Sequence, residues 1–67
     1  MNTATDREPT MTEWAASNAL RSLDYAQSQL NHARKYLEAG KLELAVDAME
    51  RMAAALDDAN VNASQGL

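Results

Sequence analysis

Residues 37–45 read LEAGKLELA, and the Ala39-Gly40 step within this stretch decides the fold. Glycine can take the left-handed backbone conformation that closes a helix, and helical patterns lead up to this step and away from it. The sequence therefore predicts an all-α chain in which one helix ends at about residue 39 and a second begins at about Lys41.

The outer ends of the two helices are predicted from capping residues and from loss of pattern. Thr10 and Glu13 fit a capping box, in which each side chain binds the backbone amide of the other residue. The first helix should therefore span about 11–39. The second loses its apolar pattern near Asn60 and should span about 41–60. The predicted organisation is a disordered arm (1–9), a helical hairpin (10–60) and a flexible tail (61–67).

Apolar residues recur along both helices at alternating steps of three and four, which is the spacing of a heptad seam. When the chain is folded back at Gly40, six pairs meet in one register, and this predicts an antiparallel hairpin. The expected pairs are Leu37 with Leu42, Ala33 with Ala45, Leu30 with Met49, Ala26 with Met52, Leu23 with Leu56, and Ala19 with Ala59, and Ala16 extends the seam of the first helix.

The aromatic residues of the chain lie on one line of the first helix, apart from this seam. Trp14, Tyr25 and Tyr36 are spaced by eleven residues, close to three helical turns, and Gln29 and His32 lie on or beside the line. An aromatic line exposed to water is typical of an interface. We therefore expect these five residues to contact a protein.

Self-association is expected because two helices bury too little apolar surface to be stable alone. The chain has 67 residues, and 14 of its apolar residues are alanine. We predict a homodimer in which two hairpins form a four-helix bundle. Either the aromatic line forms the dimer seam, with Tyr25, His32 and Tyr36 near the two-fold axis, or a wide face of the second helix does and the aromatics bind a different protein.

A helix-turn-helix pattern covers the middle of the chain, with small, aromatic, glycine, large, alanine and large residues at set positions. These residues are Ala33, Tyr36, Gly40, Leu42, Ala45 and Met49. In this pattern residues 29–57 resemble a single tetratricopeptide repeat. The resemblance implies a helical hairpin and a protein-interaction role.

Composition excludes several classes of function. With no cysteine and one histidine, the chain offers neither a disulfide nor the ligands of a metal cage. A net charge of −4 disfavours nucleic-acid binding, because no basic face is available to replace phosphate counterions. No apolar run approaches the ~20 residues of a membrane span, and the first ten residues lack the features of a targeting peptide. We therefore expect a cytoplasmic protein without cofactors.

Catalysis is not expected. His32 is the one imidazole that the chain offers for acid-base catalysis, and Ser28 and Tyr36 lie one helical turn away. A serine–histidine pair would also need an orienting acid and an oxyanion hole, which a long regular helix does not provide. We interpret His32 as an interface or surface residue and predict that the protein is not an enzyme.

An acidic strip on the outer side of the second helix has two interpretations. Glu43, Asp47 and Glu50 share this side. They form either a solvated face, which we favour, or a docking face for a basic protein surface.

Three classes of function stay open. The first is a small acidic regulatory or adaptor protein that binds another protein, for example an inhibitor of a host protein encoded by a phage or mobile element. The second is an assembly subunit or small chaperone that masks a helix of its partner. The third is a dimeric nucleic-acid regulator that uses Arg34, Lys35 and Lys41. We favour the first, because brevity, acidity, expected self-association and the lack of catalytic groups all fit it.

Overall fold

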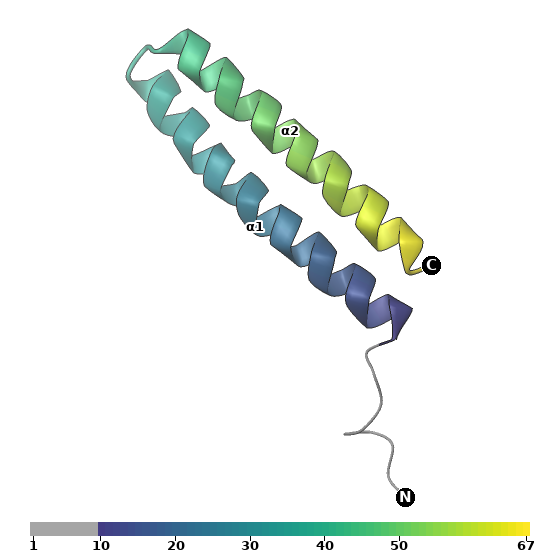
Figure 1. Ribbon diagram of the computed structural model, residues 1–67. Coiled ribbons are helices and arrows are strands. Elements are labelled where there is room, and N and C mark those ends of the chain that lie inside the picture. The colour runs from purple at the N-terminus through teal and green to yellow at the C-terminus, as the bar shows by residue number, and fades with distance from the viewer. Residues whose placement is uncertain (1–9) are drawn as a thin grey trace, which may run out of the picture.

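The computed structural model describes residues 10–67 and contains two helices. Helix α1 runs from Met11–Glu38 and helix α2 from Leu42–Gln65. They lie side by side and run in opposite directions, with the connecting turn at one end and the chain's C-terminus beside the start of α1 (Figure 1). The predicted antiparallel hairpin is confirmed. The predicted arm, residues 1–9, lies outside the described residues.

Helix α1 begins at the capping box that the sequence predicts. The hydroxyl of Thr10 accepts a hydrogen bond of 3.1 Å from the backbone amide of Glu13. The Glu13 carboxylate in turn accepts one of 2.7 Å from the amide of Thr10. Both bonds satisfy amides that have no partner within the first turn of a helix, so they fix where α1 starts.

The turn between the helices depends on Gly40, whose φ of 74° lies in the left-handed region. Its amide donates to the carbonyl of Leu37 at 3.1 Å, and the amide of Lys41 donates to the carbonyl of Tyr36 at 2.8 Å. This pair of bonds is the Schellman motif, which satisfies the last carbonyls of a helix and reverses the chain. A single glycine therefore sets the geometry of the hairpin.

Helix α2 is longer than expected and continues past residue 60 to Gln65. The Asn62 side chain donates to the carbonyl of Asp58 at 2.9 Å on the preceding turn. Gly66 then caps the helix, and its carbonyl accepts a 3.3 Å hydrogen bond from the hydroxyl of Thr12. The first turns of α1 consequently lie alongside the end of α2, whereas the shorter predicted helix would have left them projecting.

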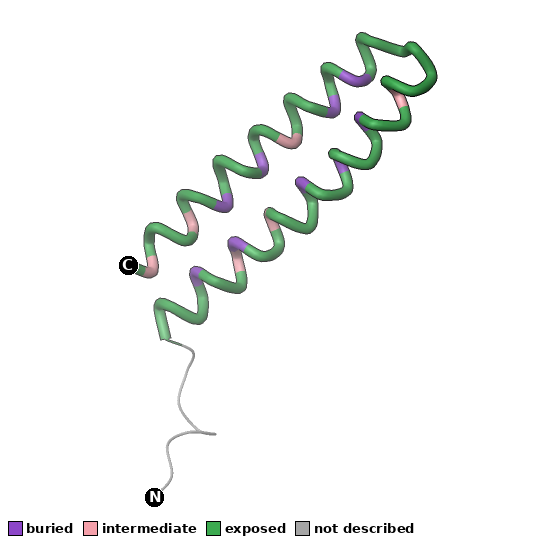
Figure 2. The backbone as a smooth tube through the Cα atoms, turned by 180° about the vertical axis from the view of Figure 1, so that it is seen from behind, coloured by how far each residue is buried: buried purple, intermediate pink, exposed green. Residues whose placement is uncertain are grey.

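The contact between the helices is made mainly of alanine. Every buried apolar residue among residues 10–67 is an alanine, and their exposed fractions lie between 0% and 9%. Figure 2 shows the buried positions along the inner sides of both helices. Small side chains let two helix backbones approach closely, so the core is thin. The alanine seam consists of Ala15, Ala19, Ala26 and Ala33 on α1 and Ala45, Ala48, Ala55 and Ala59 on α2.

The seam predicted from the heptads is wrong in six of its seven large residues. Ala19, Ala26, Ala33, Ala45, Met52 and Ala59 do lie at the contact, as expected. The other expected members are exposed to between 36% and 64%, and Ala16 is exposed as well. Each helix is rotated so that alanine, and not leucine, faces its neighbour. The displaced residues are Leu23, Leu30, Leu37, Leu42, Met49 and Leu56.

Neither α1 nor α2 combines the length and the apolar character that crossing a membrane requires.

Candidate functional site

The hairpin leaves most of its large apolar side chains outside the contact between the helices, and six of them form one surface. We call this surface the leucine face. Its members are Leu23, Leu30 and Leu37 of α1 and Leu42, Met49 and Leu56 of α2.

Helix geometry places these six residues on one side of the hairpin. At about 100° per residue, the three leucines of α1 are rotated by about 50–90° from the centre of its contact line. The three residues of α2 are rotated by about 70–110° in the same sense. Because the two helices are antiparallel, the same sense of rotation points to the same side of the pair. The leucine face therefore extends across both helices.

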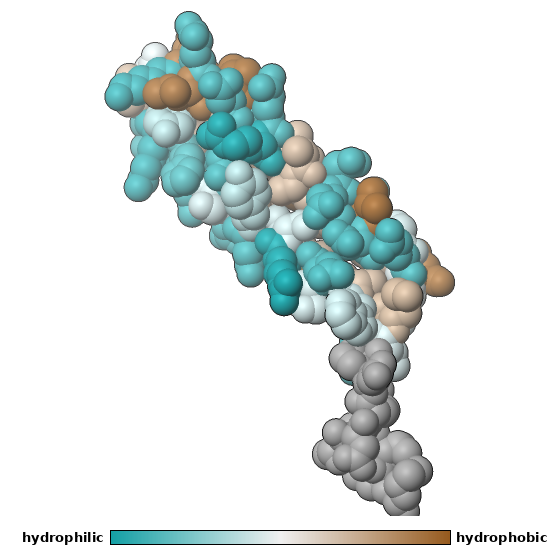
Figure 3. Space-filling model, in the orientation of Figure 1, coloured by the Kyte–Doolittle hydropathy of each residue, from teal (hydrophilic) through white to brown (hydrophobic). Residues whose placement is uncertain are grey.

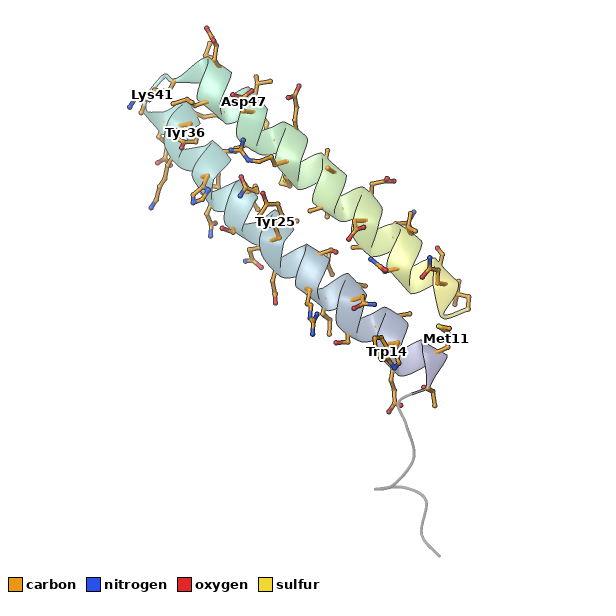
Figure 4. The ribbon with its side chains drawn as sticks, in the orientation of Figure 1. Met11, Trp14, Tyr25, Tyr36, Lys41 and Asp47 are labelled. Carbon is orange, nitrogen blue, oxygen red and sulfur yellow. The ribbon has the colours of Figure 1, made fainter. Side chains whose placement is uncertain are left out.

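The aromatic side chains lie on the opposite side, which we call the aromatic face and define by Trp14, Tyr25 and Tyr36. They are rotated from the contact line of α1 in the opposite sense to the leucines. Trp14 is 57% exposed and Tyr25 is 49% exposed, while Tyr36 is half-buried near the turn. Figure 4 shows Trp14 and Tyr25 on the side turned to the viewer. Figure 3, in the same orientation, shows that this side is mainly hydrophilic.

A shallow hollow of about 460 Å³ opens beside Tyr25 on the aromatic face. Arg21 and Arg51 contribute two cationic groups to its lining, and Asp58 contributes one carboxylate. That carboxylate accepts a 2.6 Å hydrogen bond from the hydroxyl of Ser22 across the helix pair. The lining therefore combines a tyrosine ring with an excess of positive charge, in a chain whose net charge is −4.

A second hollow, of about 330 Å³, lies beside Trp14. Met11 and Asn18 line it from α1, and Gln65 lines it from the last turn of α2. The lengthening of α2 thus provides one wall of this hollow without covering the indole ring. Trp14 is exposed because it is rotated away from the contact line of α1.

Gln29 departs from its predicted role in protein interaction. Its exposed fraction is 6%, and its side-chain oxygen accepts a 2.9 Å hydrogen bond from Nε of Arg51. Gln29 therefore holds the two helices together and is closed to an outside partner. His32 is exposed on α1, so it stays a candidate contact residue.

The predicted acidic strip is exposed along α2. Glu43, Asp47 and Glu50 all face solvent, and the first two line a small hollow of about 270 Å³ with Leu42 and Val46. The hollow combines apolar and acidic lining near the turn. No side chain of opposite charge contributes to it.

Arg51 and Asp58 are the functional candidates that reasoning from sequence missed. Each lies opposite a polar residue of α1 in the same antiparallel register, Arg51 opposite Gln29 and Asp58 opposite Ser22. The predicted register pairs Gln29 and Ser22 with residues one or two positions away, so it would have found neither bond.

No group of three histidine, cysteine or acidic side chains within residues 10–67 is arranged to hold a metal ion.

Comparison of the chain with protein-family models, with curated proteins and with solved structures gives no match. The resemblance of residues 29–57 to a tetratricopeptide repeat therefore stays a prediction.

Proposed function

We propose that this chain is a small acidic regulatory or adaptor protein that acts by binding another protein through its aromatic face. The observation that carries the proposal is the exposure of Trp14 and Tyr25 on one side of the hairpin, each beside a hollow. Tryptophan, tyrosine and arginine are the residue types that dominate binding energy at protein interfaces. The packing of the two helices against each other does not by itself require the Trp14 or Tyr25 ring to be exposed.

The lining of the Tyr25 hollow indicates the chemistry of the partner. Arg21 and Arg51 line the same hollow as Tyr25, and their guanidinium groups match carboxylates in both charge and shape. A partner segment with an acidic side chain next to an apolar one would place the carboxylate between the arginines and the apolar group against the ring. The Asp58 carboxylate, which accepts hydrogen bonds from Ser22 and Asn62, offsets one of the two positive charges, so one positive charge remains in the lining.

Affinity capture from the native host tests the proposal, with wild type, Trp14→Ala and Leu20→Ala as three baits. Leu20 is a matched control, because it also lies on α1 and is 60% exposed but belongs to neither face. A partner that is captured by wild type and Leu20→Ala, and is lost with Trp14→Ala, is the expected result. A partner retained equally by all three baits would remove Trp14 from the interface and contradict the proposal.

A further inference from the structure

The leucine face is built in three layers along the hairpin. Leu37 and Leu42 form the layer nearest the turn, Leu30 and Met49 the middle layer, and Leu23 and Leu56 the third. Successive layers are seven residues apart, about 10.5 Å along each helix, which is the repeat by which helices interlock in coiled coils and bundles. The face therefore has the pattern of half a bundle core.

The carboxylates of the acidic strip lie away from this face, so they leave two copies free to approach each other through it. Glu43, Asp47 and Glu50 lie on the outer side of α2, rotated by about 100° or more from the centre of the leucine face. Repulsion between two chains of net charge −4 is weakest where the contact surface carries no carboxylate. The middle of the leucine face therefore favours another uncharged apolar surface.

The side of the hairpin that carries the leucine face has about the size that a specific interface needs. Helix α2 has 24 residues and is thus about 36 Å long, and two adjacent helices are about 20 Å wide. Their common side covers about 700 Å², close to the ~800 Å² per partner of a standard protein interface. The hairpin itself buries only alanine as its apolar core, so a covered leucine face would supply the large apolar contacts that it lacks.

We infer that the leucine face binds the leucine face of a second copy, and that two hairpins form a four-helix bundle with the aromatic faces outside. A two-fold axis across the helices brings Leu30 against Leu30 of the other copy. An axis along the helices brings Leu30 against Met49. Both arrangements superpose the three layers, so the face is complementary to itself. The inference does not depend on the proposed function, which concerns the opposite face.

Sedimentation equilibrium of wild type, Leu30→Gln and Leu44→Gln tests this inference. Leu44 is the matched control, because it is exposed to a similar degree, 45% against 41%, but lies on the other side of α2. Wild type and Leu44→Gln are expected to be dimers, with a dissociation constant at least about tenfold higher for Leu30→Gln. A monomeric wild type would overturn the inference, as would equal effects of the two substitutions.

Cysteine cross-linking keeps the test valid if Leu30→Gln unfolds the chain. The chain has no cysteine, so single variants give unambiguous products. If the two-fold axis runs across the helices, disulfide-linked dimers are expected from Leu30→Cys alone. If it runs along the helices, they are expected from Leu30→Cys mixed with Met49→Cys. Leu44→Cys should stay uncross-linked in each case. A folded dimer that cross-links through Leu44→Cys or Tyr25→Cys and not through Leu30→Cys would place the interface on the aromatic face and contradict the inference.

Discussion

Arg51 of α2 donates a 2.9 Å hydrogen bond from its Nε to the side-chain oxygen of Gln29 of α1. Gln29 is the only buried polar side chain among residues 10–67, while Arg51 is exposed overall and reaches in from the edge of the hairpin. The bond therefore satisfies a polar group inside an otherwise alanine-lined contact. It also fixes the register of the two helices, since a shift of either helix would break it.

The unequal burial of these two residues predicts unequal effects of their removal. Arg51→Met leaves the Gln29 oxygen buried without its partner and should lower the free energy of unfolding by about 1–3 kcal/mol. Gln29→Met leaves a guanidinium that water can reach and should cost less than about 1 kcal/mol. Urea unfolding followed by circular dichroism, at one fixed protein concentration, measures both. A larger loss of stability for Gln29→Met than for Arg51→Met would show that the buried Gln29 oxygen does not need the hydrogen bond from Arg51.

The alanine seam should not accept larger side chains. Ala48 is fully buried, so Ala48→Leu must push the helices apart and should reduce stability by about 1–3 kcal/mol. Ala54 is exposed on the same helix and lies away from both the seam and the leucine face, so Ala54→Leu should change stability by less than about 0.5 kcal/mol. Thermal unfolding of the two variants provides the comparison. Equal melting temperatures would argue against close packing at Ala48.

Gly40 should be required for its backbone conformation alone. No atom lies within 4 Å of the position that a Cβ would take, but the φ of 74° is unfavourable for any other residue. Gly40→Ala is therefore expected to cost about 1–2 kcal/mol, and Gly40→Asn less, because asparagine tolerates this conformation better. Chemical denaturation of both variants measures the difference. If Gly40→Ala is as stable as wild type, the turn can form without the left-handed conformation at residue 40.

Gly66 should be required because the position leaves no space for a side chain. A Cβ at this position would lie 2.7 Å from the Cβ of Ala15, while its φ of −87° is ordinary. Gly66→Ala should therefore loosen the last turn of α2, and a second substitution, Ala15→Gly, should restore it. Amide hydrogen exchange at residues 62–65 reports this local change. Faster exchange that the second substitution leaves unchanged would mean that the effect does not arise from contact with Ala15.

Local signals in the sequence predicted most of the fold. The capping box at Thr10 and Glu13 and the glycine turn at residue 40 each act through a few neighbouring atoms, so they hold whatever the rest of the chain does. The antiparallel hairpin was also predicted, because a turn at Gly40 sends the second helix back along the first. These features fix which elements form and how they run.

The rotation of each helix about its axis was not predictable in the same way. The heptads with leucine contain no polar residue, whereas the true contact line of α1 includes Ser22 and Gln29, which count against it in a hydrophobicity pattern. What reverses the choice is tertiary: Asp58 and Arg51 of α2 supply their hydrogen-bond partners. The rotation that turns Ser22 and Gln29 toward α2 is also the one that exposes the leucine face. The heptad pattern did not predict this rotation, and it therefore placed the residues of this face in the core.

Alanine, and not leucine, closes the hairpin. Thiol labelling of Ala55→Cys and Leu44→Cys, at a concentration where circular dichroism shows a folded chain, measures this packing. Ala55 lies in the alanine seam at 7% exposure, and Leu44 is 45% exposed on the side away from the leucine face. Labelling of Ala55→Cys should be slower than that of Leu44→Cys by about tenfold or more. Similar labelling rates for the two variants would show that Ala55 is not buried. That result would contradict an alanine seam and would place the leucines at the contact between the helices.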